Sequence, residues 1–345
     1  MFIESFTVIC LIALLAFPKI KIYPSGEYND EYLSLSNTLQ LRGFMAVLIV
    51  IHHLSGWFSA ASLLAPFKFI GYLIVAVFFF ISGYGLYYGF CRKTNYLKNF
   101  LRNRLPNVYI PYFIFTIIWS IGLDFTQDKV TFKDFILSLV GYRIFLIGGW
   151  YIVVLIIMYI LFYVSFRQDK INRLVLFFLL FSAVFAAFFI FDKTLWLRSL
   201  LSFPIGILWC KYKDKIDEFF KKHYSLMFFV CILVFVIFVV VRLFSELKNL
   251  TLAFNLSSIL TSSFFTLIVI ISLKKISLNN KVLVFLGKIS NEIYLLHYLF
   301  LILLSKSELI SSHIALFVIC TFLTVIPVAY LLNKLDIKLV SLIKK

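Results

Sequence analysis

The sequence is poor in charged residues, and acidic residues are especially few. Only 14% of its 345 residues are charged, and 33 lysines and arginines stand against 16 aspartates and glutamates. A soluble domain of this length has about a quarter of its residues charged, because polar groups have to cover its surface. Since 62% of this chain is hydrophobic, one water-soluble core cannot hide its apolar side chains. The composition excludes secreted disulfide scaffolds, disordered tails and soluble nucleic-acid binders, and it predicts an integral membrane protein.

Cysteine frameworks, metal-ligand spacings and nucleotide-binding loops are also lacking. The cysteines form no C-x-x-C pair, and their odd number argues against a disulfide framework. There is no phosphate-binding loop of the Walker type and no G-x-S-x-G nucleophile motif. We therefore expect no metal site and no permanently bound cofactor, and we interpret the cysteines as packing residues. The cysteines are Cys10, Cys91, Cys210, Cys231 and Cys320.

Long apolar runs, in contrast, are abundant. A helix that crosses a membrane needs roughly 20 mostly apolar residues. The runs predict an all-α fold, a polytopic membrane helical bundle with about eleven transmembrane helices. We expect residues 1–35 to form an N-terminal anchor and linker, and residues 36–345 to form the main membrane domain. The predicted spans lie near residues 2–17, 41–59, 68–91, 105–123, 150–166, 174–191, 195–210, 224–244, 251–273, 288–305 and 312–333.

One further apolar segment, residues 132–147, does not fit the alternation of spans. It carries Lys133, Asp134 and Arg143, which are costly in the middle of a bilayer. We interpret it as an interfacial or re-entrant piece on the outer side, because irregular backbone is tolerated at membrane depth only where protein covers it.

The basic residues predict the orientation. Cytoplasmic segments of membrane proteins carry an excess of lysine and arginine. If the N-terminus is outside and the C-terminus is cytoplasmic, 24 of the 33 basic residues fall on the cytoplasmic side. The net charge of +17 is then a topology signal and not a sign of nucleic-acid binding. Membrane lipid is the expected partner, and the cytoplasmic segments would be 18–42, 92–104, 167–173, 211–223, 274–288 and 334–345.

The second span holds the strongest group of ionisable residues. Each such residue is a candidate functional residue, because it is expensive in the membrane unless it is paired or hydrated. At about 100° per residue, Arg42 and His53 share one helix face and lie roughly 16 Å apart along the axis, whereas His52 points about 80° away from Arg42. The ordinary pKa of a histidine side chain lies near neutral pH, which suits general-base chemistry. His53 is therefore the candidate that would act with Arg42. The alternative is a neutral histidine hydrogen-bonded to a neighbouring helix.

Two later segments carry further candidates. Ser82 lies in a serine- and glycine-rich stretch that either packs helices closely or contributes to a site. A basic loop follows, in which Arg102 and Arg104 either set topology or hold a phosphorylated cytoplasmic ligand. Near the C-terminus, Ser290 and His297 share a helix face to within about 20°. His297 is expected near mid-membrane, where packing and chemistry remain equal alternatives.

These segments, in this order, resemble the membrane acyltransferase-3 family of bacterial O-acyltransferases. The resemblance covers about residues 36–333, and its most specific element is an arginine followed by ten residues and a histidine, which Arg42 and His53 match. The matching segments are LRGFMAVLIVIHH, FFFISGYGL, FLRNRLPNVYIPYF, GGWYIVVLIIMYIL, SFPIGILWCKYKDKI and LGKISNEIYLLHYLFL.

The resemblance implies a ten-helix core, preceded here by the extra N-terminal helix. It implies transfer of an acyl group, usually acetyl, from cytoplasmic acyl-CoA to a hydroxyl of a cell-envelope polysaccharide or lipid-linked sugar, in the cell inner (cytoplasmic) membrane. His53 and Arg42 would be catalytic. Arg104 would be the first arginine of an R-x-x-R motif that binds the acyl-CoA, and Asn107 stands where the family often has the second arginine. Arg102 would compensate for that departure and is the other residue expected to bind the acyl-CoA. The remaining matched motifs suggest four substrate-binding residues: Ser82, Trp150, Tyr294 and His297.

A different class of function fits the same composition. A multi-pass transporter or a polymerase of surface polysaccharide precursors would also carry arginine and histidine inside the membrane. A transporter would more often show duplicated halves with paired broken helices, which we do not find. A purely structural protein would not explain why Arg42 and His53 share a face. The sequence leaves the acceptor sugar, the acyl chain and the oligomeric state undetermined.

Overall fold

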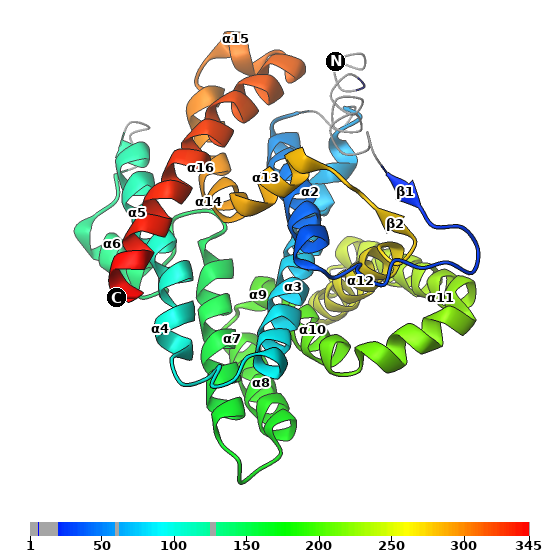
Figure 1. Cartoon of the computed structure of the whole chain (residues 1–345). Helices are drawn as coiled ribbons and strands as arrows, with labels where there is room; N and C mark the ends of the chain where they lie inside the picture. The colour runs from blue at the N-terminus through cyan, green and yellow to red at the C-terminus, as the bar shows by residue number, and fades with distance from the viewer. Residues whose placement is uncertain (1–5, 7–19, 59–61, 125–128, 345) are drawn as a thin grey trace.

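The computed structural model of the chain is a bundle of helices (Figure 1). It describes Phe6 and residues 20–58, 62–124 and 129–344. Helices make up nearly all of its regular structure, so the predicted all-α membrane bundle is confirmed. The predicted N-terminal span at 2–17 lies, Phe6 apart, outside the described residues.

Eight helices in the described part are long and apolar enough to cross a membrane. Each coincides with a predicted span. They are α2 (Leu35–Leu54, continued by the 3₁₀ turn η1, Ser55–Trp57), α3 (Gly71–Arg92), α5 (Pro106–Asp124), α7 (Gly149–Arg167), α8 (Arg173–Ile190), α11 (Lys213–Leu247), α12 (Thr251–Ser272) and α16 (Ile314–Lys344).

Shorter elements connect and complete these helices. The two strands pair antiparallel, with Lys21 opposite Ser277. α14 is apolar but has only 16 residues. The shorter elements are β1 (Lys21–Ile22), η2 (Ala65–Phe69), α4 (Phe100–Arg104), α6 (Phe132–Leu139), α9 (Thr194–Leu200), α10 (Ser202–Lys211), β2 (Ile276–Ser277), α13 (Lys281–Lys288), α14 (Ser290–Ser305) and α15 (Glu308–Ser311).

The predicted span at 195–210 is not one continuous helix. The chain forms α9 and α10, which meet at Leu201. Pro204 explains the break, because a proline has no N–H to donate to the carbonyl four residues earlier, at Leu200. The two short helices together still extend through the bundle, and Gly206 of α10 packs directly against the α3 backbone at Phe80.

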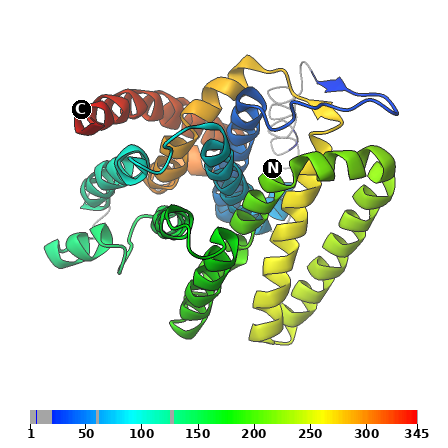
Figure 2. The same cartoon turned by 60° about the horizontal axis from the view of Figure 1, so that its bottom comes forward.

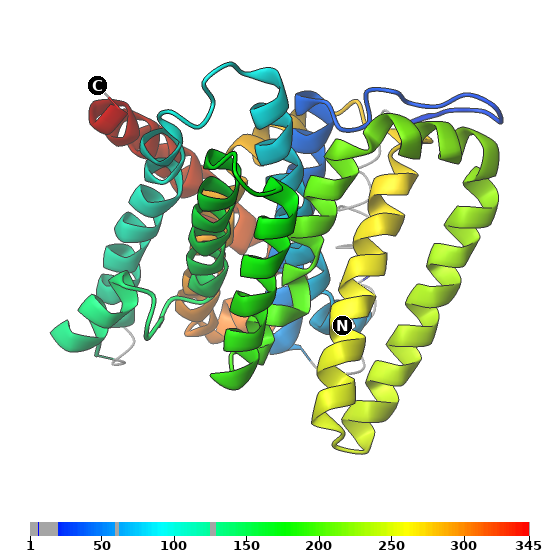
Figure 3. The same cartoon turned by 90° about the horizontal axis from the view of Figure 1, so that it is seen from below.

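α11 is longer than its predicted span, and the segment expected at the interface, 132–147, contains one short helix. α11 begins eleven residues before the predicted span and bends at His223, whose backbone leaves the helical region. Figure 3 shows its first part lying across one end of the bundle and the rest running along the edge of the bundle. α6 has eight residues and is about 12 Å long, too short to cross a bilayer. Segment 132–147 therefore does not span as a helix, which agrees with its interfacial interpretation.

The helices divide into a buried centre and an apolar periphery. α2 and α3 are the most enclosed, whereas α8 and α11 expose many apolar side chains. Figure 2 shows α11 and α12 side by side at one edge of the bundle and α5 with α6 at the other. Exposed apolar helix faces are what a lipid-embedded protein presents to acyl chains. The centre of the bundle is thus the place where polar side chains can meet away from lipid.

The two ends of the bundle are distinguished by their connections. We call the end with β1, β2 and the C-terminus the strand side, and the end with the α11–α12 turn the hairpin side (Figure 3). On the strand side, Asp217 accepts hydrogen bonds from Tyr32 Oη at 2.8 Å and from Lys213 Nζ at 2.6 Å, and it also pairs with Lys274. Burial raises the pKa of Tyr32 and lowers that of Lys274. The segment before α2 is therefore fastened to α11 and to the end of α12.

Close approach of two helices fixes the position of α2. A Cβ atom on Gly43 would overlap the carbonyl oxygen of Leu283, and one on Gly287 would overlap that of Leu39. Both obstacles are backbone, so neither can move aside as a flexible side chain would. These two glycines seat α2 against α13 and bring Arg42 to the beginning of α14.

Gly43→Ala is expected to destabilise the protein by about 1–3 kcal/mol, the usual cost of overpacking a dense core. Gly85→Ala is the matched control, because a Cβ there meets no atom within 4 Å and alanine favours a helix. The midpoint of thermal unfolding of each purified variant in detergent measures the difference. Equal midpoints for the two variants would contradict the packing described here.

Candidate functional site

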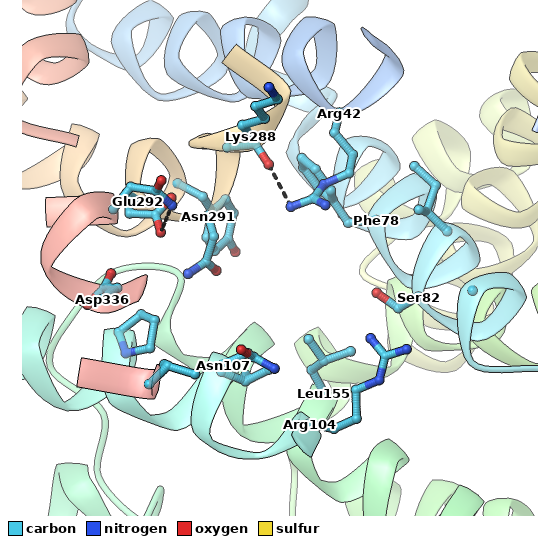
Figure 4. A pocket seen from close by; sticks show the side chains of 18 of the residues that line it. Arg42, Phe78, Ser82, Arg104, Asn107, Leu155, Lys288, Asn291, Glu292 and Asp336 are labelled. Carbon is cyan, nitrogen blue, oxygen red and sulfur yellow. Dashed lines mark hydrogen bonds between the residues drawn. The ribbon is translucent and has the colours of Figure 1, made fainter. Parts of the chain in front are cut away.

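A cleft of about 670 Å³ opens between the helices. Its walls come from α2, α3, α5, α7, α14 and α16, with contributions from the ends of α4 and α13. Figure 4 shows its polar side chains pointing into one space from segments far apart in the sequence. The beginnings of α2 and α5 and the ends of α13 and α16 line it, so the cleft belongs to the strand side. Its volume suits a ligand larger than a simple ion.

Arg42 occupies the wall formed by α2. Its Nη2 donates a hydrogen bond to Ser290 Oγ at 3.0 Å, and Ser290 Oγ donates to the carbonyl of Gly287 at 3.0 Å. Arg42 is only partly buried. One side of the guanidinium is thus fixed to α14. Its remaining N–H groups make no other hydrogen bond within the described part of the chain and can meet an anionic ligand in the cleft.

Arg104 lines the cleft, but Arg102 does not. Arg104 Nη2 donates to Tyr96 Oη at 2.8 Å, and burial raises the pKa of Tyr96 even though Arg104 opposes that rise. Arg102 instead donates to the carbonyl of Lys344 at 2.7 Å and is exposed. The structure therefore separates the two arginines that sequence reasoning grouped as donor-binding residues.

Asn107, where the resemblance would often place a second arginine, also lines the cleft. Its Oδ1 accepts a hydrogen bond from Lys344 Nζ at 2.9 Å. Lys344 ends α16 and is itself a lining residue. Lys344 thus places a positive charge beside Asn107, although it comes from the far end of the sequence. Sequence reasoning could not find this pair, because 237 residues separate its members.

The opposite wall carries two buried carboxyl groups. Glu292 and Asp336 are each 3% exposed, and both line the cleft on the side away from Arg104 and Ser82 (Figure 4). Glu292 Oε1 accepts from Asn333 Nδ2 at 2.9 Å. Glu292 Oε2 and both oxygens of Asp336 meet no N–H donor in the described residues, and the two carboxyl groups interact with each other. Four cationic residues of the cleft, Arg42, Arg104, Lys288 and Lys344, still outnumber these two acids.

Ser82 and Tyr294 are cleft residues, as a substrate-binding role requires. Ser82 lies beside Tyr151 and Tyr159, two buried tyrosines of α7 that also line the cleft. Tyr294 packs against Tyr151 with ring centroids 5.4 Å apart. Trp150 is not a lining residue; its ring lies 6.5 Å from that of Phe79. The structure thus brings Ser82 and Tyr294 together and leaves Trp150 apart from them.

His53 lies deeper than the cleft, beside His297. The two ring centroids are 5.1 Å apart, and the ring of Tyr298 contacts His53 edge-on at 4.9 Å. His297 Nδ1 is 3.0 Å from the carbonyl oxygen of Ile293. A carbonyl oxygen only accepts, so Nδ1 carries the proton and Nε2 is an acceptor. That Nε2 is buried without a hydrogen-bond partner among the described residues.

His52 has a different environment from His53. Its Nδ1 lies 2.8 Å from the carbonyl oxygen of Phe67, and its ring fills the space beside Gly71, where no Cβ projects. By the same argument Nδ1 is the protonated nitrogen. His52 therefore fastens η2 and the beginning of α3 to α2, which is the neutral, helix-bonded arrangement considered as the alternative for both histidines.

Arg42 and His53 meet the same neighbouring helix. Arg42 bonds Ser290 and His53 contacts His297, so the shared faces expected on α2 and on α14 both occur. Tyr294 lies between the two contact points: it lines the cleft, and its ring is 6.2 Å from that of His297. His53 is partly exposed but is not itself a lining residue of the cleft. The arrangement is an arginine-rich cleft connected through Tyr294 to an imidazole pair.

Asp336, Asn333 and Lys344 are functional candidates that the sequence analysis missed. The last predicted span ends at residue 333, whereas α16 continues to Lys344 and buries Asp336. The sequence did carry one sign of this, since Asp336 is an isolated acidic residue directly after a long apolar run. Groups of three or more histidine, cysteine or acidic side chains able to hold a metal ion do not occur in the part of the chain the structure describes.

One family of known proteins matches the chain. A family model described as an acyltransferase domain, that of the acyltransferase-3 family, matches residues 40–334. No curated protein and no solved structure gives a significant match. The match covers most of the chain, close to the extent of the resemblance found in the sequence. The chain therefore belongs to the membrane acyltransferase-3 family.

Proposed function

We propose that the protein transfers an acyl group, in the first instance acetyl, from acyl-CoA to a hydroxyl of a cell-envelope polysaccharide or lipid-linked sugar. Acyl-CoA is a substrate in this proposal, and no permanently bound cofactor takes part. The single observation that carries it is the cleft, whose arginines suit an anionic donor and whose floor at Tyr294 adjoins the His53–His297 pair. Family membership supports the acyltransferase part of the proposal.

The donor would enter from the strand side. Arg42, Arg104 and Lys344 provide donors for phosphate groups, since guanidinium groups bind phosphate oxygens in pairs. The cytoplasmic assignment of this side follows from the positive-inside rule, which also puts the C-terminus in the cytoplasm and the N-terminus outside. In this orientation, in a bacterial cytoplasmic membrane, acyl-CoA reaches the cleft from the compartment that makes it.

The reaction would take place at the far end of the cleft, beyond Tyr294. His53 accepts the proton of the acceptor hydroxyl while the hydroxyl oxygen attacks the thioester carbonyl carbon of the donor. The carbon–sulfur bond breaks, and the same proton passes from His53 to the CoA thiolate. In the covalent alternative His53 carries the acyl group between the two substrates. His297 would be a positioning residue, because its free Nε2 can accept an N–H from the His53 ring.

Radiolabelled acetyl-CoA tests the proposed function. Membranes that contain the protein are incubated with acetyl-labelled donor, and label is counted in the isolated envelope glycan and lipid-linked sugar fractions. Label should enter one of them only when the protein is present, and free CoA should be released in step. A transporter or polymerase would move or extend its substrate without consuming acetyl-CoA, and that result would overturn the proposal.

Asp336→Asn is expected to lower KM for acyl-CoA by about threefold or more at low salt. The substitution replaces an acidic group of the cleft by a neutral amide and should strengthen the attraction of the cleft for an anionic donor. Steady-state kinetics at low and at high ionic strength check the expectation, since salt should reduce the difference. Lys288→Gln, which removes a cation from the same cleft, is the converse control and should raise KM. An unchanged KM in both variants would show that the donor does not bind here.

A further inference from the structure

A second group of buried charges lies on the hairpin side, away from the cleft. Arg198 is in α9, and Arg242 is in the last two turns of α11. Both guanidinium groups approach Phe254, near the beginning of α12, with Cζ atoms 4.7 and 4.8 Å from its ring centroid. Arg242 is 8% exposed, and Tyr72 of α3 covers it at 5.3 Å. Two cations therefore share one aromatic ring inside the protein and repel each other.

The described residues balance this charge only in part, because Glu246 forms an ion pair with Arg242 and no acidic residue among them pairs with Arg198. The nearest acid is Glu246, whose Oε2 is 3.8 Å from Arg242 Nη1, beyond hydrogen-bond distance, and whose side chain is half exposed. The other partners are neutral: Arg242 Nε donates to Ser258 Oγ at 3.2 Å, and Arg198 Nη2 donates to Asn255 Oδ1 at 3.3 Å. Arg198 Nε is buried and has no hydrogen-bond partner among the described residues.

Such an arrangement is unfavourable without a further anion. A desolvated guanidinium costs several kcal/mol unless a counter-charge and hydrogen-bond acceptors meet it. Aromatic contacts offset only part of this, about 0.5–2 kcal/mol for each cation. Arg198 is only partly buried, so an anionic group can reach its guanidinium from outside.

The surroundings indicate what carries that anion. Arg242 is five residues, about 7 Å, from the end of α11, and Phe254 is three residues from the beginning of α12. The neighbouring turns expose apolar side chains: Leu247 is 81% exposed and Leu252 57%. Lipid headgroups lie at the depth of the last one or two turns of a membrane-spanning helix. The arginines and these exposed apolar side chains are at that depth. A lipid-borne anion fits this place better than a soluble one.

We propose that Arg198 and Arg242 form a binding site for the phosphate group of a lipid on the hairpin side. A lipid phosphate has two or three non-bridging acceptor oxygens in a tetrahedral arrangement, and it matches two guanidinium groups better than a planar carboxylate does. Glycerophospholipids and isoprenoid carrier lipids both present this group. The site is separate from the cleft and does not depend on acyl transfer.

Thermal unfolding of the full-length protein in a neutral detergent tests the site. The probes are dihexanoyl phosphatidic acid and farnesyl phosphate, and dihexanoylglycerol and farnesol are their phosphate-free counterparts. A ligand that binds the folded state raises the unfolding midpoint in a saturable manner. We expect this rise with at least one phosphate probe and with neither counterpart. The preferred phosphate probe identifies the lipid class.

The arginine variants connect the effect to the site. Arg198→Gln and Arg242→Gln should each weaken the apparent affinity about tenfold or more, the loss of a charge-assisted hydrogen bond. Arg143→Gln is the control, because Arg143 is an exposed arginine in a surface ion pair with Asp134. If a glutamine variant does not fold, Arg198→Lys replaces it. This variant should weaken binding at least about threefold, because lysine keeps the charge but lacks the paired N–H donors of a guanidinium group.

Three results would overturn the proposal. One is the absence of any phosphate-dependent rise in the wild type. Another is a phosphate-dependent rise in the unfolding midpoint that is the same in the wild type, in the Arg198 and Arg242 variants and in the control Arg143→Gln. The last is a rise with octanoate but with neither phosphate probe, which would show a carboxylate site instead.

Discussion

His53→Ala is expected to lower the rate of acyl transfer by ~10²–10⁴, the usual contribution of a general base. The loss should appear in kcat, because His53 does not line the cleft that would hold the donor. Membrane insertion and the unfolding midpoint should change little, since His53 is only partly buried and its neighbours His52, His297 and Tyr298 stay in place. Rates with saturating labelled donor measure the effect.

His52→Ala is the matched control for this prediction. Its ring nitrogen is bound to the carbonyl of Phe67, so its removal should loosen η2 and lower the unfolding midpoint more than kcat. The loss of kcat in His297→Ala should be intermediate between the losses in His52→Ala and His53→Ala. Because His297 would position His53, its removal should also change the pH profile of kcat. Full activity of His53→Ala would remove the proposed mechanism, and equal losses for His52 and His53 would contradict the different environments of the two rings.

Arg42→Gln is expected to raise KM for acyl-CoA by about tenfold to a hundredfold, with a smaller effect on kcat. The expected size is that of losing one or two hydrogen bonds from a charged donor to phosphate. Ser290 would lose its bond from Arg42 but would keep its own donation to Gly287, so the beginning of α14 should stay in place. Donor-concentration series on the purified enzyme give KM and kcat separately.

Arg102→Gln is the control for the arginine prediction. Arg102 lies outside the cleft and binds the carbonyl of Lys344, so KM should change less than about twofold. Arg104→Gln should resemble Arg42→Gln, because Arg104 lines the cleft. If Arg102 proved more important than Arg42 and Arg104, the cleft would not be the donor site.

Local geometry explains what the sequence could predict. The spans at α3, α5 and α12 lie within a few residues of their predictions, because long apolar runs end at charged or turn-forming residues. The relation of Arg42 to His53 was predictable because an α-helix turns by a fixed angle per residue. The same arithmetic applies to Ser290 and His297. Both pairs meet across α2 and α14 in the structure.

Contacts between distant segments account for what the sequence could not predict. The Asn107–Lys344 hydrogen bond joins the beginning of α5 to the end of α16. Glu292 and Asp336 come together only when α14 packs on α16. The separation of Arg102 from Arg104 depends on the orientation of one short helix, α4. The break between α9 and α10 had a visible signal in Pro204, which the hydropathy of the run concealed.

The charged groups of the bundle occupy opposite ends. The cleft on the strand side collects Arg42, Arg104 and Lys344, whereas Arg198 and Arg242 lie near the turn on the hairpin side. Buried polar and charged groups in a membrane bundle are expensive, so their presence at both ends favours function over packing.

The most direct test of the central claim is to locate the acyl end of the bound donor. An acyl-CoA with a photoreactive diazirine at the end of its acyl chain is bound to the purified protein, irradiated and mapped by peptide mass spectrometry. The account predicts labelling of the α2 and α14 peptides that contain His53, Tyr294 and His297, suppressed by excess acetyl-CoA and weakened in Arg42→Gln. Labelling confined to other helices, or labelling that acetyl-CoA does not suppress, would contradict it.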